Sequence, residues 1–210
     1  MDRHIVVLGG GAAGTLAAKR LRCYCDSPDV SVLIVDGTRT PGTVPLAAAD
    51  RYGPQALRLP EHLYLRDGID VRHVEVAAVD LARAEVCLRD GTTVPYDVLV
   101  VATGTPSAAD GAGSKGAGYV TRCGGPVDGL GPVRVDPATR RSRTDPLVYA
   151  IDAAVGEQHP TGQVLHAQAE RLARSVRGYL AGNPSPPKRA AVPPRRGGKG
   201  THMGPSLPAP

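Results

Sequence analysis

Three glycines and an aspartate near the start of the chain have the types and the spacing that bind a dinucleotide. Gly9, Gly11 and Gly14 form a GxGxxG pattern, and Asp36 follows about 20 residues further on. The first glycine permits a tight turn, the second lets the backbone approach a pyrophosphate, and the third lets a helix lie close to a strand. A carboxylate in the place of Asp36 accepts hydrogen bonds from ribose hydroxyl groups. The four residues predict a dinucleotide site; the alternative is a glycine-rich turn that binds nothing.

The elements that must position these residues are a strand, a helix and a second strand. The apolar run 4–8 predicts a buried strand, residues 15–21 predict a helix, and the apolar run 30–35 predicts a second strand that ends at Asp36. Ala12 and Ala13 lie where this helix begins. A helix N-terminus offers unbonded N–H groups and partial positive charge to phosphates, so the unit favours a ligand over an empty turn.

The remaining apolar segments predict an α/β domain. Alternation or apolar runs predict strands at 69–76, 96–104, 133–136 and 147–151, Asp90 and Gly91 predict a hairpin turn, and helical spacing predicts a helix over 162–181. Residues 105–132 are rich in glycine and proline, as linkers are. We expect a Rossmann-like domain with a central parallel sheet, a small antiparallel β-meander and a disordered tail at 183–210.

The net charge of +5 belongs to this tail. Its five basic side chains and lack of acidic ones account for the whole net charge, which leaves residues 1–182 neutral. A neutral domain gives no electrostatic support to nucleic-acid binding. The tail either contacts phosphates or anionic lipid, or is a solvated extension.

The cysteines and the apolar runs indicate a cytoplasmic protein. Cys23, Cys25, Cys87 and Cys123 have neither zinc-site spacing nor the spacing of a redox dithiol, so we expect reduced thiols. No apolar run approaches the length of a transmembrane segment, and the charged start of the chain does not have the pattern of a signal peptide.

Three segments, in this order, resemble the pyridine nucleotide-disulfide oxidoreductase superfamily, especially type II NADH dehydrogenase and sulfide:quinone reductase relatives. They are the GxGxxG unit with Asp36, the segment 96–104, and the segment 147–154 with the long helix after it. The resemblance implies FAD as the cofactor. It places the pyrophosphate and adenosine ribose on the first segment, and the strand at 96–104 beside the cofactor. The residues that it implies along the cofactor, besides those of the first segment, are Val76, Ala102, Thr103, Gly104, Asp152 and Gln163.

Asp152 and Gln163 have separate roles in this resemblance. Asp152 would bind the ribityl chain, and the helix that contains Gln163 would point its N-terminus at the flavin. A helix N-terminus there stabilises the negative charge of reduced flavin and raises its redox potential.

The chain departs from the family in two places. Relatives carry an NAD(P)H-binding domain of roughly 120 residues between the second and third segments, an ordinary size for a small domain. Here about 40 residues separate Gly104 from Leu147, and they are rich in glycine and proline. We therefore expect one FAD-binding domain over 1–182, made of 1–107 and 133–182 with a linker at 108–132. The third segment, Ile-Gly-Asp-Ala in relatives, lacks its glycine, so Asp152 either still reaches the ribityl chain or is a plain helix N-cap.

Candidates for a catalytic side chain are few. His166, near the start of the last helix, is either a proton donor at the flavin or a helix-surface histidine. Cys123 is either a reactive thiol in a glycine-rich region or has no catalytic role. Tyr52 either contacts the flavin ring or packs in the core.

The sequence favours a compact FAD-binding oxidoreductase that acts on a small molecule. It would receive electrons from a separate reductase or electron-donor protein, from free reduced nicotinamide, or from the substrate itself. Two alternatives stay open. One is a repurposed scaffold that catalyses a non-redox cyclisation or isomerisation of a small organic substrate, and the other is a non-catalytic partner subunit.

Overall fold

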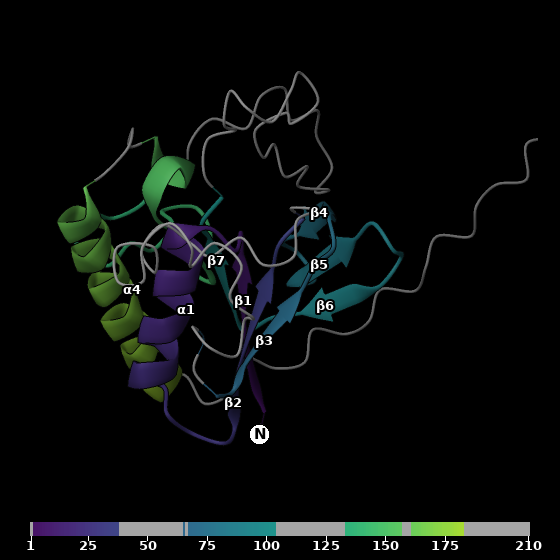
Figure 1. Ribbon diagram of the computed structural model, residues 1–210, viewed down its shortest axis with the longest axis horizontal. Helices are drawn as coiled ribbons and strands as arrows, with labels where there is room; N and C mark the ends of the chain where they lie inside the picture. The colour runs from purple at the N-terminus through teal and green to yellow at the C-terminus, as the bar shows by residue number, and fades with distance from the viewer. Residues whose placement is uncertain (1, 38–64, 66, 104–132, 157–160, 183–210) are drawn as a thin grey trace, which may run out of the picture.

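The computed structural model describes residues 2–37, 65, 67–103, 133–156 and 161–182 (Figure 1). Five parallel strands form the central sheet in the order β3-β2-β1-β7-β8. They are β1 Arg3–Leu8, β2 Val30–Val35, β3 Ile69–Arg72, β7 Val98–Val101 and β8 Val148–Ala150. This order, with β1 in the middle, is that of a Rossmann-type sheet and confirms the predicted fold class.

Two helices cover one face of the sheet (Figure 1). They are α1, Ala12–Tyr24, and α4, Gly162–Gly182, which pack side by side. Their contact uses small and aliphatic side chains, among them Ala17, Leu21, Ala169 and Ala173, all fully buried. Small residues let the two helices approach closely, and the core they form with the sheet contains a single fully buried aromatic ring among the described residues, that of Tyr149.

A three-stranded antiparallel meander covers the other face (Figure 1). Its strands are β4 Val76–Asp80, β5 Glu85–Leu88 and β6 Thr93–Pro95. Val79, Val86 and Leu88 pack against the ends of β1 and β2 in a second apolar cluster. The sheet therefore lies between a helical layer and the meander.

Two expected strands differ from the structure. The alternating segment 69–76 divides into β3, which pairs with β2, and the start of β4, which pairs with β5. Pairing with β2 ends where Arg72 meets Val35, and the chain then crosses to the meander. The expected strand 133–136 makes only an isolated bridge between Val135 and Ser142.

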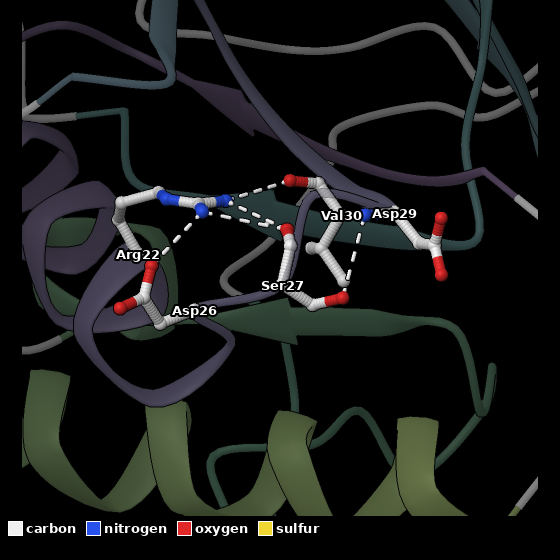
Figure 2. Close-up of polar contacts among 5 residues, drawn as sticks. All are labelled: Arg22, Asp26, Ser27, Asp29 and Val30. Carbon is white, nitrogen blue, oxygen red and sulfur yellow. Dashed lines mark hydrogen bonds and ion pairs between the residues drawn. The ribbon is translucent and has the colours of Figure 1, made fainter.

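Arg22 fixes the turn that leads from α1 to β2 (Figure 2). Its Nη1 donates to the carbonyl oxygens of Val30 at 2.7 Å and Ser27 at 3.3 Å, while Nη2 pairs with Asp26 at 3.1 Å. The backbone N–H of Asp29 donates to the Ser27 hydroxyl at 3.3 Å in the same turn. One guanidinium thus ties the last turn of α1 to the start of β2, the strand that ends beside Asp36.

The cysteines of the described residues form no disulfide bond. Cys23 is exposed, Cys87 is half-buried, and Cys25 is buried beneath the end of α1. Burial raises the pKa of the Cys25 thiol, which keeps it protonated at neutral pH. Neither α1 nor α4 is long and apolar enough to cross a bilayer, and this holds for every helix in the described part of the chain.

Candidate dinucleotide-binding site

The carboxyl ends of β1, β2 and β7 meet at one edge of the sheet. The N–H of Gly9 donates to the carbonyl of Val35 at 2.8 Å, and the N–H of Ala102 donates to the carbonyl of Leu8 at 2.9 Å. The N–H of Asp36 donates to the carbonyl of Arg72 at 3.0 Å. These bonds continue the sheet past the last strand residues and bring Gly9, Asp36 and Ala102 together.

Gly9 and Gly14 have the close backbone contacts that their places in the pattern predict. Gly9 has φ of +100°, in the left-handed region that favours glycine, and a β-carbon on it would lie 2.7 Å from the carbonyl oxygen of Ala102. A β-carbon on Gly14 would lie 1.8 Å from the carbonyl oxygen of Gly9. The turn between β1 and α1 therefore excludes side chains at both positions.

Gly11 differs from both because it faces open space. Its φ of −64° suits any residue, it is exposed, and nothing lies within 4 Å of the position that a β-carbon would take. The open space above Gly11 would let a pyrophosphate lie close to the protein backbone.

The N-terminus of α1 is open to an anion. The first helical bond runs from the N–H of Thr15 to the carbonyl of Gly11 at 3.0 Å, so the N–H groups of Ala12, Ala13 and Gly14 have no acceptor within the helix. Gly11 supplies no side-chain cap, and the first turn contains no acidic residue. The Thr15 hydroxyl instead donates to the carbonyl of Gly10 at 3.0 Å and steadies the turn. The helix dipole and these N–H groups favour a bound phosphate.

Asp36 lies against Gly10, a position that the sequence pattern leaves variable. A β-carbon on Gly10 would lie 2.5 Å from Oδ2 of Asp36. The carboxylate therefore reaches the backbone of the glycine-rich turn only because residue 10 has no side chain. The GxGxxG pattern does not identify Gly10, because it accepts any residue there, and the contact with Asp36 is visible only in the structure.

Asp152 takes a left-handed backbone conformation at the end of β8. The N–H of Ile151 donates to the carbonyl of Val101 at 3.1 Å, and the chain then enters a short 3-10 helix, η3, Asp152–Val155. Asp152 has φ of +61°, and its N–H donates to Oε1 of Gln168 at 3.0 Å. Asp152 thus has a left-handed backbone conformation at the place in the chain where the glycine of the third segment is missing.

The start of α4 is capped by Thr161. The N–H of Val164 approaches the Thr161 hydroxyl at 3.4 Å, and the N–H of Leu165 donates to the Thr161 carbonyl at 3.0 Å. Gln163 and His166 are exposed on the first turns of α4. Asp152 is therefore not the N-cap of α4; it begins η3.

The other predicted residues divide into described and undescribed ones. Ala102 is buried and Thr103 is half-buried. Val76 is the first residue of β4. Its neighbour Glu75 lies against Gly37, because a β-carbon on Gly37 would be 3.1 Å from the α-carbon of Glu75. Gly104, Tyr52 and Cys123 lie outside the described residues, as do the linker 108–132 and the tail 183–210. No group of histidine, cysteine, aspartate or glutamate side chains suited to a metal occurs in the described part of the chain.

The chain is similar to known proteins in sequence and in fold. Residues 3–135 match the family described as "Pyridine nucleotide-disulphide oxidoreductase". A probable ferredoxin reductase of Castellaniella defragrans is 36% identical over 110 residues, which are 50% of this chain and 27% of that protein. The chain thus spans about a quarter of the length of this curated relative.

Two solved structures are similar to the chain. A thioredoxin reductase from Gloeobacter violaceus has 15% identity and a TM-score of 0.55, over 88% of this chain and 97% of that one, and shows the same fold. A NAD-dependent persulfide reductase from A. fulgidus has 30% identity and a TM-score of 0.39, over 50% of this chain and 22% of that one.

Proposed function

Because the chain belongs to the pyridine nucleotide-disulphide oxidoreductase family, whose members are oxidoreductases that bind FAD, we propose that it is itself a FAD-binding oxidoreductase. One observation carries the proposal. The N-terminus of α1 is uncapped beneath the open space at Gly11, with the Asp36 carboxylate against the same turn. Unbonded N–H donors for the phosphates, a turn without side chains and a carboxylate that can accept hydrogen bonds from ribose hydroxyl groups are the features that an adenine dinucleotide requires.

Each part of the site has a role in this proposal. The N–H groups of Ala12 and Ala13 hold the pyrophosphate over Gly11, and Asp36 accepts hydrogen bonds from the adenosine ribose. Val76, Ala102 and Thr103 line the cofactor where β4 begins and β7 ends, and Gly104, which lies outside the described residues, stays a further proposed contact.

The ribityl chain and the flavin ring of FAD would bind on the side of the site formed by the end of β8 and the start of α4. The Asp152 carboxylate accepts hydrogen bonds from hydroxyl groups of the ribityl chain. The N-terminus of α4, near Gln163, places positive electrostatic potential at the flavin. His166, exposed on the next turn, is the candidate that holds or delivers a proton there. FAD, when bound, supplies the electron-transfer chemistry, while these residues bind and orient it.

The proposed oxidoreductase takes its electrons from outside this domain. Only about 40 residues join Gly104 to Leu147, fewer than a nicotinamide-binding domain of ordinary size needs. The similarity to a probable ferredoxin reductase favours exchange with a separate electron-carrier protein, with a small molecule as the other redox partner.

The first test is a titration of the purified protein with FAD, followed by absorbance and flavin fluorescence. We expect saturable binding of FAD and weaker binding of FMN, which lacks the adenosine that Asp36 would hold. Anaerobic addition of NADH, NADPH and a reduced ferredoxin then identifies the donor that bleaches the flavin. No binding of FAD contradicts the proposal, and bound FAD that none of these donors reduces favours the alternative of a non-redox scaffold.

A comparison of substitutions at two aspartates tests the assigned place of the ribose. Asp36 and Asp29 lie at opposite ends of β2, and only Asp36 lies at the site. Asp36→Asn should raise the dissociation constant for FAD about tenfold, the loss of one charge-assisted hydrogen bond. Asp29→Asn should leave it unchanged. Equal effects of the two substitutions would contradict the assigned place of the ribose.

A further inference from the structure

Asp152 is one of three described residues other than glycine with φ in the left-handed region, the others being Ala84 and Arg140, and it is the one that lies at the proposed site. Its φ of +61° brings the β-carbon close to the carbonyl oxygen, a contact that glycine avoids. Strained residues persist where the surrounding structure holds them, and they gather at functional sites. The surroundings of Asp152 should therefore contain the group that holds it.

Gln168 is that group. It lies on α4, where the other buried side chains are Leu165, Ala169, Leu172, Ala173 and Val176. Gln168 is only 2% exposed, and its Oε1 accepts the Asp152 N–H at 3.0 Å. Because a backbone N–H needs an acceptor, this bond also fixes which end of the amide faces Asp152. A buried polar side chain on an apolar helix face is stable there when it makes such a hydrogen bond.

The bond joins the two elements that flank the flavin end of the proposed site. Asp152 follows directly on β8 and begins η3, whereas Gln168 lies in the second turn of α4. The N–H of Ile151 is already bonded to Val101, so β8 itself is held to the sheet. The Gln168 bond then holds the N–H of the next residue, Asp152.

We propose that Gln168 is a positioning residue for the cofactor: it clamps the Asp152 backbone in the left-handed conformation and so fixes the direction in which the Asp152 carboxylate is presented to the ribityl chain. This inference rests on the proposed function, in which Asp152 receives ribityl hydroxyl groups. Gln168 acts through Asp152 and does not itself contact FAD.

A double-mutant cycle on FAD binding separates this role from a structural one. Gln168→Met keeps the length of the side chain and removes the acceptor, and Asp152→Asn removes the carboxylate charge. We expect each to raise the dissociation constant for FAD about tenfold, and the double variant to raise it about tenfold as well, because the two act in series. A hundredfold loss in the double variant, or no loss in Gln168→Met, overturns the inference.

Two further variants guard against effects of simple destabilisation. Leu172→Ala, one turn along the same face of α4, should lower the melting temperature and leave FAD affinity unchanged. Gln168→Asn keeps an amide but is too short to reach Asp152, and replaces Gln168→Met in the cycle if that variant does not fold. Loss of FAD affinity in Leu172→Ala as large as in the Gln168 variant contradicts a specific role.

Amide hydrogen exchange provides a readout without FAD. The Asp152 N–H should be protected in the wild-type protein and exchange at least tenfold faster in Gln168→Met. Protection without FAD binding by the wild type shows that the proposed function fails while the clamp exists. FAD binding with an unprotected Asp152 N–H shows the reverse and overturns the inference alone.

Asp152→Gly should change the melting temperature and the affinity for FAD in opposite directions. Glycine accepts the left-handed conformation at no steric cost, so the melting temperature without FAD should rise. The carboxylate is lost, so FAD affinity should fall about tenfold. A lower melting temperature, or unchanged FAD affinity, contradicts the view that Asp152 is strained for the sake of the cofactor.

Discussion

Gly9 and Gly14 are in direct backbone contact across the turn between β1 and α1. A β-carbon on Gly14 would lie 1.8 Å from the carbonyl oxygen of Gly9 and 2.9 Å from its carbonyl carbon. This contact places the first turn of α1 against the end of β1, and with it the unbonded N–H groups at the carboxyl edge of the sheet. Both partners are main chain, so no side-chain rearrangement relieves a clash here.

Gly14→Ala should lower the free energy of unfolding by about 1 to 3 kcal/mol or more, because the added methyl group forces the turn apart. Urea denaturation measures this loss, and FAD affinity should fall with it as the helix N-terminus moves. Gly178→Ala is the matched control. Gly178 lies inside α4, with nothing within 4 Å of the position that a β-carbon would take. The free energy of unfolding of Gly178→Ala should rise by about 0.5 to 1 kcal/mol, because alanine has a higher helix propensity than glycine. Equal stability of Gly14→Ala and the wild type would refute the close contact.

Gly11→Ala should separate cofactor binding from stability. Its backbone is already in a conformation open to alanine and its β-carbon would face empty space, so the free energy of unfolding without FAD should change by less than about 1 kcal/mol. The same methyl group enters the cradle proposed for the pyrophosphate, and FAD affinity should fall by about tenfold or more. Isothermal titration and urea denaturation of the same preparation test both halves. Unchanged affinity would show that no ligand approaches Gly11.

The βαβ unit at residues 4–36 could be predicted because local pattern and tertiary structure agree there. Only its boundaries moved: the helix expected over 15–21 is Ala12–Tyr24, since Ala12 and Ala13 belong to the helix as well as to the glycine-rich turn. The segment 69–76 was harder, because alternation continues through the point where the chain leaves one sheet for another. Periodicity identifies a strand but does not identify its neighbour.

Parts of the candidate site lay beyond sequence reasoning for a different reason. The contact between Gly10 and Asp36, and the bond from Asp152 to Gln168, join residues far apart in the chain or at positions that the pattern leaves variable. Gln168 has the sequence signature of any polar residue on an amphipathic helix. Its burial follows from its place on the buried face of α4 next to Asp152, which the sequence pattern does not show.

Arg22→Met should lower the free energy of unfolding by about 2 kcal/mol. The substitution keeps much of the apolar stem, but leaves the carbonyl groups of Val30 and Ser27 without their shared donor. The side chain of Arg22 is largely buried, with 13% exposure, so water replaces the guanidinium poorly. Urea denaturation monitored by far-UV circular dichroism measures the change.

Arg22→Lys and Asp26→Asn identify which contacts matter. Lysine keeps the charge, but it lacks the planar fork by which Nη1 donates to the two carbonyl groups while Nη2 pairs with Asp26, so it should recover only part of the loss. The Asp26 carboxylate is 72% exposed, and its neutralisation should cost less than about 0.5 kcal/mol. A larger loss from Asp26→Asn than from Arg22→Met would mean that the ion pair, and not the carbonyl bonds, holds the turn.

Glu170 should make the contact between α1 and α4 dependent on pH. Its carboxylate accepts a hydrogen bond from the Tyr24 hydroxyl and one from Arg174 at 3.0 Å, and pairs with Arg20 at 3.6 Å. The Tyr24 hydroxyl, followed by the guanidinium groups, lowers the pKa of Glu170. A folded-state pKa below the unfolded one stabilises the native state above the unfolded pKa, and this contribution disappears as pH falls through the folded pKa.

Glu170→Gln should therefore cost about 0.2 to 1 kcal/mol at pH 7, as expected for a partly exposed ion cluster. The difference from the wild type should shrink as pH falls from about 4.3, the ordinary glutamate pKa, toward lower values. Urea midpoints at pH 7, 4 and 3 measure this convergence, and Tyr24→Phe, which removes the hydroxyl but keeps the ring, should show part of it. Added salt should also narrow the gap at pH 7, because it screens exposed charges. A stability difference that is the same at pH 7 and pH 3 would mean that the carboxylate charge of Glu170 plays no part in joining the two helices.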